Sequence, residues 1–93
     1  MTTIIDGIPR ITPEDIKSEI VSQQYHRFPG TNVTVCCVTL RNGFNAVGSS
    51  ACADDRLFDP DLGEQIALKD AEGKLWPLLG YELCSNIAAG RPG

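Results

Sequence analysis

The spacing of hydrophobic and polar residues predicts two helices, and the first lies near the start of the chain. In "ITPEDIKSEIVSQQY", from Ile11 onward, the apolar positions at Ile16 and Ile20 are four residues apart, as on one face of an amphipathic helix. Thr12 is a good N-cap residue, and Pro13 suits the first helical position. The pattern predicts a helix from residue 13 to about residue 27, where "FPG" stops it. Residues 1–10, interrupted by glycine and proline, are expected to form an extended arm.

The middle of the chain predicts a β-hairpin. Residues 32–40, "NVTVCCVTL", are rich in β-branched side chains, and Asn42-Gly43 suits a type I′ turn because both central residues need positive φ. A two-residue turn places Arg41 opposite Phe44 and Val38 opposite Val47. In this register the Val38–Val47 face packs on a helix. The other face is expected to leave space for a ligand or partner, because it carries small residues at Ala46, Gly48 and Ser50.

The last third of the chain predicts a second helix and a third strand. Asp59 is a good N-cap and Pro60 suits the first helical position, so a helix is expected from about residue 60 to 75, ended by Pro77. "LLGYEL", residues 78–83, reads as a strand, and residues 84–93 as a flexible tail. The predicted fold is a single small α+β domain over residues 11–83, in the order α-β-β-α-β, with an antiparallel hairpin packed on two helices.

Composition excludes several classes of function. The chain has 93 residues and a formal net charge of −4, so it lacks the excess of basic residues that duplex nucleic acid or an anionic membrane attracts. No apolar run approaches the length of a membrane span, and the first residues do not have the pattern of a signal peptide. The expected location is the host cytoplasm.

Catalytic and metal-binding patterns are missing from the sequence. His26 is the only histidine, and the four cysteines show no CxxC or Cys/His spacing. Cys36 and Cys37 are adjacent on a predicted strand and point to opposite faces. Neither a G-x-S-x-G elbow nor a phosphate-binding P-loop occurs. We therefore expect a protein that is not an enzyme and needs neither a metal nor a cofactor.

Several motifs occur together in the chain. "FPGTNVTVCCVTLRNGFNAVGSSAC" and "FDPDLGEQIALKDAEGKLWPLLGYEL" resemble a family of small tailed-phage proteins named after early proteins of phages N4 and Sf6. The shared features are a Phe-Pro-Gly-Thr segment, an Asn-Gly-Phe hairpin, a Ser-Ala-Cys strand end and a Trp-Pro-Leu-x-Gly-Tyr-x-Leu segment. The likeness runs from about Glu14 to Leu83. Asp70 stands where the family pattern has an amide, which argues against a pyrophosphate contact there.

That family is similar to the first class of Thoeris anti-defence proteins. The resemblance implies a sponge, a homo-oligomer that sequesters a cyclic ADP-ribose isomer and, in some members, cyclic oligonucleotides, without cleaving them. A rival hypothesis is a protein-interaction module that binds and inhibits a host protein, for instance by pairing with an exposed strand.

A doubly charged cyclic nucleotide needs cations for phosphate, a flat face for the base and polar groups for ribose. Each candidate residue also has a structural explanation, such as turn formation, surface solvation or an Asp70–Lys74 ion pair on the second helix. The candidates for ligand binding are Arg27, Arg41, Asn42, Phe44, Ser50, Arg56, Lys74 and Trp76.

Overall fold

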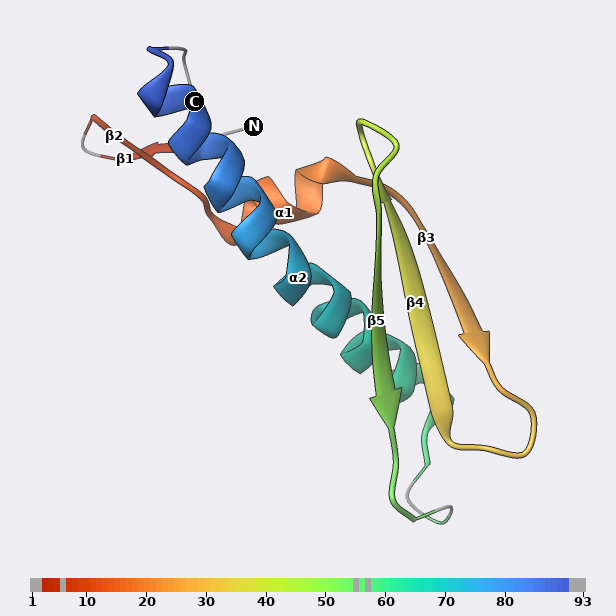
Figure 1. The fold of residues 1–93 in the computed structure, drawn as a ribbon. Coiled ribbons are helices and arrows are strands. Elements are labelled where there is room, and N and C mark those ends of the chain that lie inside the picture. Colours follow the sequence, from red (N-terminus) through yellow and green to blue (C-terminus); the bar gives the residue numbers. More distant parts are fainter. Residues whose placement is uncertain (1–2, 6, 55, 57, 91–93) are drawn as a thin grey trace.

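The fold is a three-stranded antiparallel sheet packed on one long helix, with a small two-stranded sheet beside it (Figure 1). A computed structural model describes residues 3–5, 7–54, 56 and 58–90. The α+β class is confirmed. The elements in chain order are β1 (Thr3–Ile5), β2 (Ile8–Arg10), α1 (Pro13–Glu19), β3 (Ile20–Arg27), β4 (Val33–Leu40), β5 (Asn45–Ala51) and α2 (Pro60–Ala88).

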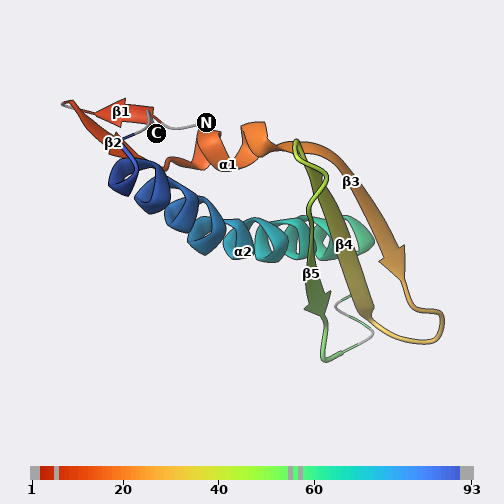
Figure 2. The same cartoon turned by 45° about the horizontal axis from the view of Figure 1, so that its top comes forward.

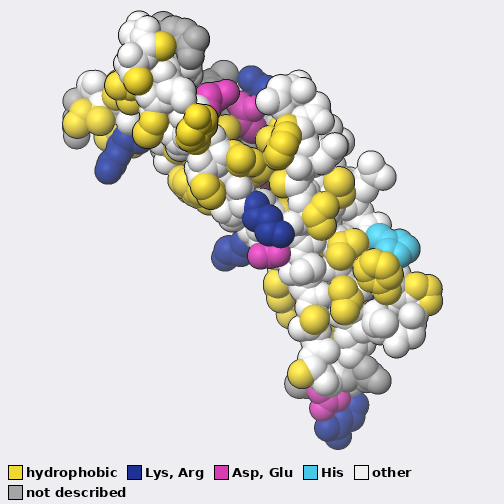
Figure 3. Space-filling view, in the orientation of Figure 1, with side chains coloured by type: hydrophobic (Ala, Val, Ile, Leu, Met, Phe, Trp, Pro, Cys, Tyr) yellow, Lys and Arg dark blue, Asp and Glu magenta, His cyan; other side chains and the backbone are white. Residues whose placement is uncertain are grey.

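The molecule is elongated, because α2 extends well past the sheet (Figures 1 and 2). Its extents are 52 × 26 × 17 Å and its radius of gyration is 16.0 Å. A compact domain of this length has a radius of gyration of about 12 Å. The shape leaves many large apolar side chains on the surface, and in Figure 3 hydrophobic side chains lie along the upper part of the molecule, where the C-terminal half of α2 runs.

The first helix begins as predicted and ends earlier. The Thr12 hydroxyl accepts from the Asp15 N–H at 3.3 Å, while the Asp15 carboxylate accepts from the Thr12 N–H at 2.8 Å. The expectation that the helix continues to about residue 27 is wrong, because β3 starts at Ile20. As a strand, β3 completes the hydrogen bonding of β4.

The predicted hairpin is confirmed, but its register is shifted by one residue. The Gly43 N–H donates to the Leu40 carbonyl at 2.9 Å, and the Leu40 N–H donates to the Phe44 carbonyl at 2.8 Å. The turn therefore has three residues, with Gly43 at φ 88°. Val38 pairs with Ala46 and not with Val47. A shift of one residue exchanges the faces of β5, so Val47 is exposed.

α2 covers the small-residue face at Ala46 and Gly48, so the expected space for a ligand or partner does not exist at these two residues. An alanine Cβ at Gly48 would lie 2.2 Å from the Ala71 nitrogen and 2.3 Å from the Ala67 oxygen. Gly48 thus lets the helix backbone lie directly on the sheet. The buried apolar core consists of Ile16, Cys36, Val38, Leu40, Ala46, Ala67, Ala71, Leu75 and Leu79.

The second helix begins as predicted but continues beyond Pro77. Asp59 caps it, and the helix runs to Ala88, so the predicted strand over residues 78–83 is wrong and residues 84–88 of the predicted tail are helical. Pro77 lacks the N–H that would bond to Gly73, and its ring crowds the carbonyl there. The continued helix buries Leu79 on the core.

The N-terminal residues form a hairpin that is attached to α1. β1 pairs with β2, with Thr3 opposite Arg10, and the Thr3 hydroxyl lies 2.9 Å from both carboxylate oxygens of Asp15. Residues 1–2 and 6 of the predicted arm, and 91–93 of the predicted tail, lie outside the described residues. No helix in the described part of the chain is long and apolar enough to cross a membrane.

Candidate ligand-binding site

A small hollow lies at the end of the sheet where β5 ends and α2 begins. Its volume is about 150 Å³. One wall comes from the strand ends, and the other comes from the start of α2 and the residue before its cap. The lining residues are Asn32, Ser50, Ala51, Cys52, Phe58, Asp59, Leu62, Gly63 and Ile66.

Hydrogen bonds hold the walls of this cavity in place. The Ser50 hydroxyl donates to the Gly63 carbonyl at 2.7 Å, which ties β5 to the first turn of α2. The Asn32 side-chain amide donates to the Cys52 carbonyl at 3.2 Å, which ties the strand ends together. Gly63 is buried, and an added Cβ there would lie 3.2 Å from Thr34 Oγ1. The cavity is therefore part of the folded framework.

A cation and an aromatic ring meet beside the cavity. The Arg27 guanidinium carbon lies 4.1 Å from the centre of the Phe58 ring. The Arg27 Nε also donates to the Thr31 carbonyl at 3.2 Å, so the side chain is held from two directions. Arg27 is exposed, and its remaining guanidinium N–H groups can bind an anion in solution.

The first turn of α2 does not offer its N–H groups to an anion. The Asp59 carboxylate accepts from the N–H groups of Asp61 and Leu62, at 3.0 and 3.3 Å. This carboxylate satisfies the helix end and places a negative charge at the cavity rim. A phosphate would therefore bind on the Arg27 side of the cavity.

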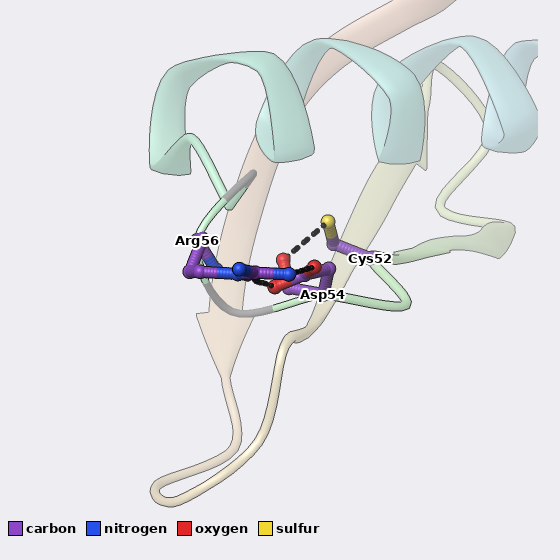
Figure 4. A network of polar contacts seen from close by, with 3 residues as sticks. All are labelled: Cys52, Asp54 and Arg56. Atoms are coloured by element: carbon purple, nitrogen blue, oxygen red, sulfur yellow. Dashed lines mark hydrogen bonds and ion pairs between the residues drawn. The ribbon is translucent and has the colours of Figure 1, made fainter.

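Arg56 lies in the segment that precedes α2, where it binds Asp54 (Figure 4). Arg56 Nη2 is 2.7 Å from Asp54 Oδ2, and Arg56 Nε donates to Oδ1 at 3.1 Å. The hydrogen bonds from Arg56 hold the pKa of Asp54 below its usual value. The Cys52 thiol donates to the Asp54 carbonyl at 3.2 Å. The charge of Arg56 is thus largely matched within its own loop.

Three of the predicted site residues lie at the opposite end of the hairpin. The Arg41 Nε donates to the Ser18 carbonyl at 3.0 Å, and the Asn42 Oδ1 accepts from the Phe44 N–H at 3.0 Å. Asn42 and Phe44 line a second hollow of about 200 Å³ together with two acidic side chains, Glu19 and Glu82. Those carboxylates make this hollow a poor site for a phosphorylated ligand.

Lys74 and Trp76 lie on different sides of α2, away from the first cavity. The Lys74 ammonium donates to the Val47 carbonyl, and the Asp70 carboxylate accepts from the Ser49 N–H at 2.9 Å. The predicted Asp70–Lys74 ion pair is therefore replaced by two contacts with β5. Trp76 is 40% exposed and lines a hollow of about 390 Å³ with Pro13, Lys17, Lys69, Glu72 and Gly73.

The structure thus places Arg27 and Ser50 at the same end of the sheet, on its two outer strands, where Phe58 contacts Arg27 and lines the cavity with Ser50. Arg56 lies in the adjoining segment, bonded to Asp54, whereas Arg41, Asn42, Phe44, Lys74 and Trp76 lie elsewhere. Asn32 and Phe58 were not predicted for the site. Phe58 precedes the Asp59 cap, and its Cε1 would lie 3.7 Å from a Cβ added at Gly63. This is the hydrophobic-staple position, so the cap motif could have indicated where the ring points.

The buried cysteine is suited to packing. Burial raises the pKa of the Cys36 thiol, and burial also raises the pKa of Tyr25 beside it. A thiol of this kind stays protonated at neutral pH. Within residues 3–5, 7–54, 56 and 58–90, no group of three or more His, Cys, Asp or Glu side chains is arranged to hold a metal ion.

Comparison with known proteins places the chain in a family. Residues 11–87 match the sequence model of the Phage protein (N4 Gp49/phage Sf6 gene 66) family. The chain therefore belongs to this family of phage proteins. Comparison with curated proteins and with solved structures gives no match.

Proposed function

We propose that this phage protein captures a cyclic nucleotide-type immune signal in the host cytoplasm and holds it uncleaved. The ligand would be a cyclic ADP-ribose isomer or a cyclic oligonucleotide, as the resemblance to Thoeris anti-defence proteins implies. Membership of the phage family supports a role inside the infected host cell. The observation that carries the proposal is the cavity beside which Arg27 and Phe58 meet, with Ser50 in its wall.

These groups have the chemistry that a cyclic nucleotide requires. A guanidinium binds phosphate oxygens through two parallel hydrogen bonds, and Arg27 carries such a group against the Phe58 ring, which lines the cavity. The Phe58 ring offers an apolar surface against which a base can pack. The Ser50 hydroxyl donates to Gly63, and its oxygen can still accept from a ribose hydroxyl.

The cavity of one chain is too small for the whole ligand. Binding pockets for small molecules have volumes of roughly 300–1,000 Å³, whereas this one has about 150 Å³. A second copy would supply the missing wall, which agrees with the homo-oligomer that the family resemblance implies. The elongated shape and the exposed apolar residues of α2 support assembly.

The cavity lining supports binding without turnover. Ser50 and Cys52 carry the potential nucleophiles, but among the lining residues that the structure describes there is neither a histidine nor a lysine to take their protons. The Asp59 carboxylate is used as the helix cap, and the Cys52 thiol donates to a carbonyl. A protein that acts by stoichiometric capture depends on slow release of its ligand.

The test is calorimetric titration of the pure protein with cyclic ADP-ribose isomers and cyclic oligonucleotides. We expect one of them to bind, and Arg27→Gln to weaken it by about tenfold to a hundredfold, as for a lost charged hydrogen bond. Arg10→Gln is the matched control, because Arg10 is an exposed arginine on β2, at the other end of the molecule. Equal loss in both variants, or no binding of any ligand, would contradict the proposal.

The rival hypothesis, a module that inhibits a host protein, predicts a different result. The protein would bind none of the cyclic nucleotides and would instead purify with a host polypeptide. Asp70 and Lys74 bind the edge of β5, so a strand of the host polypeptide would pair with β3 instead. Affinity purification from host cells, beside the titration, separates the two hypotheses.

A further inference from the structure

The two edges of the three-stranded sheet differ in how the chain covers them. In an antiparallel sheet, the main-chain groups of an edge strand point alternately toward the neighbouring strand and outward. Val47 and Ser49 are outward-facing on β5, and α2 binds both, through Lys74 on the Val47 carbonyl and Asp70 on the Ser49 N–H. α2 therefore closes the β5 edge against another strand.

The β3 edge is open. The Phe28 N–H donates to the Val33 carbonyl at 3.3 Å, and the register continues from this pair with Arg27 opposite Thr34. The main-chain groups of Gln23, Tyr25 and Arg27 therefore point away from β4. In the described part of the chain, no hydrogen bond reaches these outward groups, and no element lies beyond β3 in either ribbon view (Figures 1 and 2).

Between Ser22 and His26, β3 lacks the features that protect most edge strands, and Arg27 at its end is its one arginine. The irregularity in its register, at Val21, comes at its start, and Pro29 comes after its end. From Ser22 to Arg27 the strand contains no proline, lysine or acidic residue. An edge of this length without a bulge, a proline or a lysine is a ready template for another strand.

We propose that β3 pairs antiparallel with β3 of a second copy, around a two-fold axis at Tyr25. In this register Gln23 lies opposite Arg27 of the second copy, and each outward pair exchanges two main-chain hydrogen bonds. On the other face, Gln24 lies opposite His26. The strand is thus complementary to itself, because no two full charges of like sign face each other across the axis.

Because this register opposes no like charges, a second copy of the chain is the occupant that we assign to the β3 edge. The pairing joins two three-stranded sheets into one continuous sheet and removes the open edge of both. It concerns assembly alone, so it stands whether or not the protein captures a nucleotide. Conversely, nucleotide binding by a protein that associates elsewhere would leave the proposed function intact.

The experiment is amide hydrogen exchange, measured by NMR at low and high protein concentration together with sedimentation velocity. We expect the N–H groups of Gln23, Tyr25 and Arg27 to exchange at least about tenfold more slowly at high concentration. The N–H groups of Gln24 and His26, which bond to β4, should be protected at both concentrations. The alternation of protection along one strand identifies this edge as the interface.

Two substitutions at one exposed position sharpen the test. Gln23→Lys places a positive charge opposite Arg27 of the second copy, and we expect it to raise the dissociation constant about five- to tenfold. Gln23→Glu places a negative charge there and should lower the constant by a similar factor. The proposal is overturned if the chain stays monomeric at all concentrations, if it associates while the three outward amides stay unprotected, if both variants behave alike, or if only a host polypeptide protects these amides.

Discussion

Replacing Gly48 by alanine tests how α2 lies on the sheet. Gly48 is buried, and the new Cβ would meet backbone atoms of the helix: the Ala71 nitrogen at 2.2 Å and the Ala67 oxygen at 2.3 Å. Both distances are shorter than a carbon atom tolerates. Backbone atoms cannot rotate away as a side chain can, so the helix must move off the strand.

The size of the effect follows from this clash. Overpacking a core by one methyl group costs about 1–3 kcal/mol, and a clash with backbone belongs at the upper end of that range. We therefore expect Gly48→Ala to lower the free energy of unfolding by about 3 kcal/mol. For a domain of this size, such a loss lowers the melting temperature by roughly 10–20 °C.

Thermal unfolding followed by circular dichroism measures the effect, with Gly80→Ala as the control. Gly80 is helical and has nothing within 4 Å of an added Cβ. Its replacement should raise the free energy of unfolding by about 0.5–1 kcal/mol, because alanine favours a helix. The reasoning is refuted if Gly48→Ala melts like the parent chain while Val47→Ala is strongly destabilised, since Val47 would then be the inward residue.

Three further substitutions test other parts of the structure. Burial alone would raise the pKa of Asp15, but hydrogen bonds from the Thr12 N–H and the Thr3 hydroxyl outweigh it and lower the pKa below the usual 3.8. The ionised Asp15 carboxylate therefore stabilises the fold above pH 4, and this stabilisation is lost as the pH falls through the lowered pKa. Asp15→Asn should thus cost about 1–2 kcal/mol at pH 7 and much less at pH 2 in urea unfolding, and an equal cost at both would contradict this reading. Pro77→Ala should raise the free energy of unfolding by roughly 1–3 kcal/mol by restoring a helical hydrogen bond, and a loss of stability on thermal denaturation would argue against a continuous α2. Asp70→Ala uncovers the Ser49 N–H on β5 and should increase aggregation on warming in light scattering, whereas Lys69→Ala, an exposed neighbour, should not.

Local signals in the sequence predicted where most elements begin. Thr12-Pro13 and Asp59-Pro60 each combine a cap with a proline at the first helical position, and the structure starts a helix at both. Asn42-Gly43 predicted the hairpin but not its register. A glycine with positive φ fits a three-residue turn as well as a two-residue turn, and the choice depends on contact with α2.

The ends of elements depended on tertiary contacts that the sequence did not reveal. Residues 20–27 form a strand because β4 is there to pair with them. The helix continues past Pro77, and Leu79 gains burial on the core by continuing it. At the candidate site, Arg27 and Ser50 were predicted from chemistry, whereas Phe58 takes part only because the start of α2 folds against the strand ends.

The most direct test of signal capture is mass spectrometry of small molecules released by heat from protein that was purified from cells making the immune signal. The account predicts an intact cyclic ADP-ribose isomer or cyclic oligonucleotide, in near-stoichiometric amount, and much less of it from the Arg27→Gln variant. Release of no nucleotide, or of a linear or hydrolysed product, would contradict capture without cleavage.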